Sequence, residues 1–135
     1  MAERSADWMA QAERDLEHCH VSLEAGHFEW SCFAAQQAAE KAVKALYEAL
    51  GGEVRGHSVS AMLSQLPERH RVSGPLIDKA ARLDLYYVPT RYPNAFDSGP
   101  PRAYFTRPQA EEAWQDARAI IEHCQNQIRR ARGSD

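Results

Sequence analysis

YYVPTRYPNAFDSGPPRAYFTR, residues 86–107, is the segment around which the rest of the chain is arranged. It contains six of the chain's twelve aromatic residues, and five of the seven prolines lie within it or directly after it. Structureless loops of this length are uncommon in compact domains, and disordered segments are poor in aromatic residues. The segment is therefore predicted to be an ordered loop, held by its aromatic side chains, that presents Arg91 to a cleft.

On both sides of this loop, apolar residues recur at the spacing of an α-helix. Five helices are expected, at about 5–25, 28–50, 57–66, 73–88 and 106–130. Ser5 is the predicted cap of the first, and Thr106 with Gln109 forms a capping box for the last. We predict an all-α fold: an antiparallel up-and-down bundle of about five helices, with the long ordered loop before the last helix. One domain is expected over residues 1–135, with a core at about 5–130.

The bulk properties exclude several classes of protein. With 135 residues, 44% of them apolar, the chain can bury a hydrophobic core without stabilising disulfides or metal ions. No apolar run reaches bilayer length, and the N-terminus lacks the hydrophobic region of a signal peptide. The three cysteines are far apart and lie in helical patterns, which predicts buried thiols in a reducing compartment. A cytoplasmic protein without membrane association is expected.

Charge is distributed unevenly along the chain. The net charge is −3, but residues 1–50 carry −5, residues 51–109 carry +3 and the remainder carries −1. Such a chain is not a general polyanion binder, although its central third can attract phosphate locally. The basic residues Arg129, Arg130 and Arg132 are interpreted as favourable charges at a helix C-terminus rather than as a nucleic-acid-binding arm.

Motifs for metal or nucleophilic chemistry are missing. None of the six histidines has the spacing of a ligand set, so neither a metal site nor a cofactor is expected. His123 and Cys124 are adjacent in a helical pattern and point to different sides, which argues against a nucleophilic pair. Gly51 and Gly52 lack the lysine and the preceding strand of a phosphate-binding loop.

The remaining candidates for function centre on the loop. An arginine on a proline-rich loop offers a fixed fork for phosphate, and neighbouring tyrosines can stack on bases. The candidate ligand-binding residues are Arg91, Tyr92, Asn94, Arg102, Tyr104, His57, Lys41 and Lys44. Structural alternatives exist for each kind of residue. Arg91 would instead tie the loop to an acid such as Glu40, His57 would start a helix or pin a loop, and the lysines would be ordinary surface residues.

A polar stripe crosses the second predicted helix. It consists of Gln36, Gln37, Glu40, Lys41 and Lys44. Such a stripe is typical of a solvated face with local charge pairing. The alternative is that this face meets a partner, a second copy of the chain or the aromatic loop.

Three segments together resemble the HEPN domain family (higher eukaryotes and prokaryotes nucleotide-binding). They are FAAQQAAEKAVKAL at 33–46, GHS at 56–58 and YYVPTRYPN at 86–94, and the match spans nearly the whole chain in order. The resemblance implies a helical bundle that is usually dimeric. It also implies, for small prokaryotic members, a minimal nucleotidyltransferase as partner or the role of toxin in a toxin–antitoxin pair.

Many HEPN proteins are metal-independent ribonucleases that use an arginine, an adjacent polar residue and a histidine four to six residues later. Arg91 fits the arginine, but Phe96, Asp97 and Ser98 occupy the positions where the histidine would stand. Without an imidazole, the site lacks the obvious group for proton transfer near neutral pH. The leading hypothesis is therefore a non-catalytic nucleotide- or RNA-binding module, homodimeric and working with a nucleotidyltransferase-type partner. The alternatives are a ribonuclease in which His57 or Tyr92 handles the proton, and a purely structural interaction protein.

Overall fold

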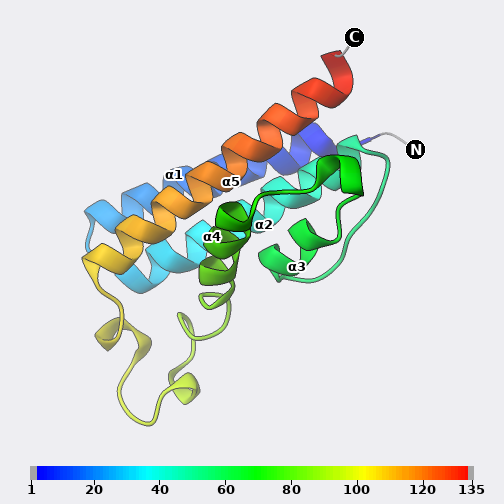
Figure 1. Cartoon of the computed structure of the whole chain (residues 1–135). Helices are drawn as coiled ribbons and strands as arrows, with labels where there is room; N and C mark the ends of the chain where they lie inside the picture. The colour runs from blue at the N-terminus through cyan, green and yellow to red at the C-terminus, as the bar shows by residue number, and fades with distance from the viewer. Residues whose placement is uncertain (1–2, 134–135) are drawn as a thin grey trace.

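The computed structural model describes residues 3–133, which form a bundle of α-helices (Figure 1). The five α-helices are α1 (Ser5–Glu24), α2 (Phe28–Ala49), α3 (Val59–Ser64), α4 (Gly74–Asp84) and α5 (Arg107–Gly133). Three short 3-10 helices lie in the connections: η1 (Glu68–His70), η2 (Pro93–Ala95) and η3 (Pro101–Ala103). The predicted all-α fold with five helices and a long loop before the last one is confirmed. Within the described residues, no helix combines the length and the apolarity that a bilayer crossing requires.

The helices α1 and α2 form an antiparallel hairpin, on which α5 packs lengthwise (Figure 1). The turn between α1 and α2 is tight because Gly26 adopts φ of +83°, in the left-handed region that glycine enters without strain. A run of alanines on α2 lets the neighbouring helices approach closely. Fully buried on this seam are Ala35, Ala38, Ala39, Ala42, Val43 and Leu46. The predicted apolar face of α5 is also buried, from Ala110 through Ile120 to Ile128.

The short helices α3 and α4 pack beside α2 and are joined by one carboxylate. Asp84, the last residue of α4, accepts hydrogen bonds from the backbone N–H of Val59 at 2.6 Å and of Ser60 at 3.3 Å. It also accepts from the Ser58 hydroxyl at 2.9 Å. Ser58 in turn caps α3 by accepting from the N–H of Ala61. The start of α3 is therefore stabilised both by its own cap and by the end of α4.

Several helix ends differ from the prediction: α3 is two residues shorter at each end, and α5 continues to Gly133. The cap of α1 is Arg4, and Ser5 lies buried inside the first turn. The helix α4 was expected to continue to about residue 88 but ends at Asp84. Pro89 has no N–H for the carbonyl of Leu85, so the helical ladder cannot continue across this point. The capping box of α5 is present, because Gln109 Oε1 accepts from the backbone N–H of Thr106 at 2.9 Å.

The loop between α4 and α5 is ordered by its aromatic residues, as predicted. Phe96 stacks on Tyr104 with ring centroids 4.1 Å apart, and both Phe96 and Tyr86 meet Phe105 edge-on. Thr90 is buried and donates its hydroxyl to the carbonyl of Tyr86 at 2.8 Å. The loop therefore has an internal apolar centre, and this centre fixes where Arg91 lies.

Candidate functional site

Arg91 lies on an aromatic platform at the first turns of α2. Its guanidinium carbon is 4.2 Å from the ring centroid of Phe33, 4.8 Å from Tyr87 and 5.2 Å from Tyr92. Nε and Nη2 donate to the carbonyl of Tyr87 at 2.9 and 2.6 Å. Nη1 makes no hydrogen bond to any residue between 3 and 133. The half-buried guanidinium is therefore held in one orientation with part of its donor set unused.

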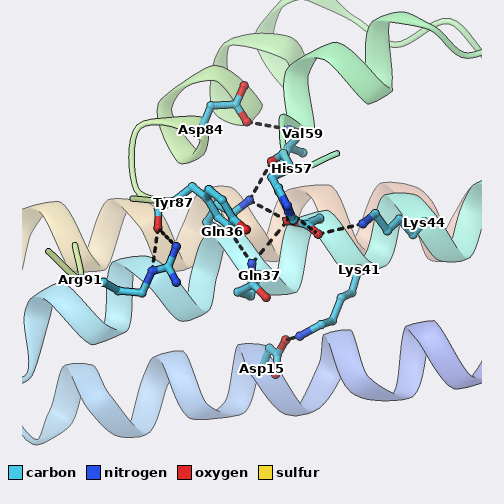
Figure 2. A network of polar contacts seen from close by, with 11 residues as sticks. Asp15, Gln36, Gln37, Lys41, Lys44, His57, Val59, Asp84, Tyr87 and Arg91 are labelled. Carbon is cyan, nitrogen blue, oxygen red and sulfur yellow. Dashed lines mark hydrogen bonds and ion pairs between the residues drawn. The ribbon is translucent and has the colours of Figure 1, made fainter. Parts of the chain in front are cut away.

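The Arg91–Glu40 pair, expected if Arg91 served only to tie the loop down, is not formed. Glu40 instead accepts from Lys44 Nζ at 3.0 Å and contacts Nδ1 of His57 at 3.1 Å (Figure 2). Among the described residues, Arg91 has no acidic partner. Within the described chain, its positive charge is therefore stabilised only by aromatic rings and a carbonyl dipole and is not neutralised.

His57 belongs to the same surface as Arg91 because both contact Tyr87. The imidazole stacks on the Tyr87 ring, with centroids 4.2 Å apart and planes 17° apart. Its Nδ1 faces the Glu40 carboxylate, which only accepts hydrogen bonds, so the neutral ring carries its hydrogen there and leaves Nε2 as the acceptor. The His57 side chain is 51% exposed. Figure 2 shows His57, Tyr87 and Arg91 following one another along α2.

The polar stripe on α2 is not the solvated face that its composition suggested. Gln36 and Glu40 are buried. Gln36 Nε2 donates to Glu40 Oε1 at 3.1 Å and to the carbonyl of His57 at 2.9 Å, while Gln37 donates to Gln36 at 2.8 Å. The segment before α3 covers these side chains, and each buried polar group then needs a partner. Within the stripe, Gln36, Gln37 and Glu40 therefore form a network that fixes the position of His57.

Lys41 and Lys44 are both half-buried and both paired within the fold. Lys41 Nζ contacts Asp15 on α1 at 2.5 Å, and Lys44 Nζ pairs with Glu40 while lying 5.5 Å from the ring centroid of Trp8. The local charge pairing that the structural alternative expected is therefore present, but both side chains are more buried than ordinary surface lysines. Lys44 joins the His57 network through Glu40, whereas Lys41 points to α1 instead (Figure 2).

The other candidate residues fall into two groups along the loop. Tyr92 is 49% exposed beside Arg91, and Asn94 is exposed two residues further, in η2. Arg102 lies exposed in η3, and Tyr104 donates its hydroxyl to the carbonyl of Ser98. Tyr104 thus closes the far part of the loop, and no contact among the described residues joins it or Arg102 to Arg91.

Sequence reasoning did not assign Phe33, Gln36 or Tyr87 to the site. Phe33 and Gln36 lie three residues apart on α2, so the sequence predicts that their side chains share one side of the helix. Phe33, however, lies outside the main apolar seam of α2. The 6.3 Å approach of Phe33 and Tyr87 joins residues more than fifty positions apart. Only the packing of the loop on α2 makes this approach, so no local signal could have revealed it.

Comparisons with known proteins show the family to which the chain belongs. A model of the HEPN domain matches residues 5–127. The chain belongs to the HEPN domain family. The matched span includes all of the candidate residues described above, from Phe33 on α2 to Tyr104 on the loop.

Individual HEPN relatives and solved structures are similar over most of their length. A Methanocaldococcus jannaschii protein named as a candidate toxin, MJ1304, is 31% identical over 124 residues, covering 85% of this chain and 82% of that protein. The crystal structure of TT1696 from Thermus thermophilus is 44% identical with a TM-score of 0.91, covering 93% of this chain and 99% of the other. That of ST0689, an archaeal HEPN homologue, is 39% identical with a TM-score of 0.80, covering 94% and 99%.

Proposed function

We propose that this HEPN protein is a nucleotide- or RNA-binding module that takes a phosphate group at Arg91. The observation that carries the proposal is the state of Arg91: oriented by the Tyr87 carbonyl, supported by three rings, and without an acidic partner among residues 3–133. A guanidinium fixed in this way loses little side-chain entropy when it binds, and its planar fork matches phosphate oxygens.

The surroundings of Arg91 suit the rest of a nucleotide. Tyr92 is half-exposed beside the guanidinium, so a base can stack on its ring. Asn94 is exposed nearby along the loop and offers an amide for a base edge or a sugar hydroxyl. We place Lys44 and His57 at the border of the site, since both are tied to Glu40.

We further propose that the protein works as a homodimer with a nucleotidyltransferase-type partner. Large apolar side chains are exposed close to Arg91 in sequence or in space, namely Leu85 at 67%, Val88 at 46%, Tyr92 at 49% and Trp30 at 47%. Exposed groups of this kind are typical of interaction surfaces. The resemblance of the chain to partner-associated HEPN proteins supports the choice of partner, and the candidate toxin MJ1304 supports a toxin–antitoxin setting.

A second candidate function, a metal-independent ribonuclease, is favoured by the Glu40–His57 pair. Positions 96–98 hold no histidine, but His57 presents Nε2 on the surface that it shares with Arg91 through Tyr87. In this scheme Nε2 accepts the proton of a ribose 2′-hydroxyl, whose oxygen attacks the adjacent phosphorus. Arg91 stabilises the added negative charge while the bond to the 5′-oxygen breaks, and that oxygen takes up a proton from solvent. We prefer the binding module, since His57 is tied into the buried α2 network.

Binding and cleavage are tested in the same samples. Fluorescence anisotropy of a labelled single-stranded RNA is measured with wild type, Arg91→Ala and the matched control Arg55→Ala, which removes an equal charge from an exposed position of the same basic third. We expect Arg91→Ala to weaken binding about tenfold, the value of one charged hydrogen bond, and Arg55→Ala to change it little. Equal effects of the two variants would contradict a site at Arg91.

RNA integrity on gels separates the two functions. Intact RNA with wild type supports the module. Cleavage that is lost in both Arg91→Ala and His57→Ala, with ends carrying a cyclic phosphate and a 5′-hydroxyl, would establish the ribonuclease instead.

A further inference from the structure

A cleft of about 500 Å³ lies between η1 and the last turns of α5. Arg69 and His70 line it from η1, while Gln127, Arg129 and Arg130 line it from α5. The start of α5 adjoins the aromatic loop, and Arg130 stands 23 residues further along the helix, roughly 35 Å away at the usual rise per residue. The last turns of α5 thus lie at the other end of the bundle from the loop between α4 and α5 (Figure 1).

A half-buried histidine joins the two sides of the cleft. His70 Nδ1 lies 3.2 Å from Gln127 Oε1, and Nε2 lies 3.2 Å from Nε of Arg69. One neutral tautomer satisfies both contacts, since Nδ1–H donates to the glutamine oxygen and Nε2 accepts from the guanidinium. His70 therefore fixes Arg69 against α5 and keeps the arginines of both elements around one space.

The charges in the cleft are unbalanced within the described residues. Arg4, Arg71 and Arg82 each pair with a carboxylate. In contrast, no ion pair within residues 3–133 involves Arg69, Arg129 or Arg130, and no carboxylate lines the cleft. Three guanidinium groups around one concave space repel one another unless an anion enters.

The helix dipole of α5 explains only part of this arrangement. It favours Arg129 and Arg130 near the helix C-terminus. It does not explain why Arg69 arrives from a different element or why His70 secures it there. An anionic ligand accounts for all three arginines. Guanidinium forks bind both carboxylate and phosphate with paired hydrogen bonds, but a phosphate group carries more charge and more acceptor oxygens, which suits three arginines around one space.

We propose that this cleft, formed by Arg69, Arg129 and Arg130, is a second phosphate-binding site. It differs from the sequence-based interpretation, in which the arginines of the C-terminal end only complemented the helix. The ligand carries phosphate, either as a free group such as pyrophosphate or as the backbone of an RNA strand. The site is independent of the role proposed for Arg91.

Two ligands and two matched variants test the cleft. Titration calorimetry with pyrophosphate and anisotropy with a labelled 20-nucleotide RNA are run on wild type, Arg130→Gln and Arg118→Gln. Both arginines are exposed on α5 and lack an acidic partner among the described residues, but Arg118 lies over Trp114 and outside the cleft. The set is repeated with Arg69→Gln and in the Arg91→Ala background, so that binding at Arg91 does not contribute.

We expect Arg69→Gln and Arg130→Gln to weaken binding of at least one ligand about tenfold in both backgrounds, with Arg118→Gln changing it less than about twofold. An effect on RNA alone identifies a strand as the ligand, and an effect on pyrophosphate identifies a free phosphate group.

Two results would overturn the proposal: equal effects of Arg130→Gln and Arg118→Gln, or no binding of either ligand to wild type. In the second case a polyglutamate peptide is titrated in the same way, and its binding would indicate an acidic protein as the ligand instead. The role of Arg91 fails separately, through an Arg91→Ala variant that binds like wild type.

Discussion

At the scale of single residues, Arg91 shows how a guanidinium group can be fixed in one orientation without a carboxylate partner. In a continuing helix, the backbone N–H of Arg91 would donate to the carbonyl of Tyr87, four residues earlier. Here Nε and Nη2 of the Arg91 side chain donate to this carbonyl instead. The ring of Phe33 lies under the guanidinium at 4.2 Å. A lysine could reach the carbonyl, but it could not keep both the paired donation and the planar stacking.

The three cysteines give a prediction about chemical reactivity. Burial raises the pKa of Cys19 to about 11 and the pKa of Cys32 and Cys124 to about 12, so thiolate is scarce at pH 8. We expect the folded protein to react with Ellman's reagent slowly at all three positions, and all three thiols to react at once in 6 M guanidinium. A thiol that reacts within seconds in the folded protein would show that this core opens readily.

His123 predicts a dependence of stability on pH. Burial lowers its pKa below the ordinary 6.5, and its Nε2 is buried without a hydrogen-bond partner among the described residues. The folded state therefore keeps this ring neutral at a pH where the unfolded chain binds a proton, so stability falls as the pH drops below about 6.5.

We expect the urea midpoint to fall between pH 7.5 and 5.5, and to fall less in His123→Gln. The exposed His18→Gln serves as the control and should retain the full decrease. An identical decrease in wild type and His123→Gln would place the pH dependence elsewhere.

At the scale of elements, the join between α3 and α4 depends on Asp84. This carboxylate accepts hydrogen bonds from two backbone N–H groups and from the hydroxyls of Ser58 and Ser60 at the start of a helix of only six residues. Such a short helix is not stable alone, and its first N–H groups have no partner inside the helix. We expect Asp84→Ala to lower the free energy of unfolding by about 2 kcal/mol.

The matched control is Asp78→Ala, which removes an exposed carboxylate from the same helix. Urea unfolding followed by circular dichroism measures both variants, with the slope of the transition expected to stay unchanged. If the two variants lose equal stability, the loss comes from net charge rather than from the end of α3.

At the scale of the whole molecule, the exposed apolar side chains beside the aromatic loop predict self-association. Leu85 is 67% exposed next to the segment that carries Arg91. We expect wild type to run as a dimer in light scattering after size-exclusion chromatography, and Leu85→Asp to shift it toward the monomer, since a charge inside an apolar contact loses its hydration. Val21→Asp, at an equally apolar and exposed position of α1, should leave the dimer intact. A monomeric wild type would exclude this surface as a homodimer contact.

The sequence alone determined the helical fold, most helix limits and the order of the loop. The helical spacing of apolar residues and the Thr106–Gln109 capping box are local signals, and the structure confirms both. The family resemblance was likewise carried by contiguous segments, and the match to residues 5–127 confirms it.

Only the tertiary structure decided what the polar residues do. Gln36 and Glu40 have the composition of a solvated face, yet they are buried, because a segment about twenty residues further along covers them. In the same way, distant parts of the chain contact each other where His57 and Arg91 both pack on Tyr87. Distant parts also come together where Arg69 lines a cleft with the end of α5. Periodicity predicts which side of a helix is apolar, but the partners of a polar group depend on which distant segment packs against it.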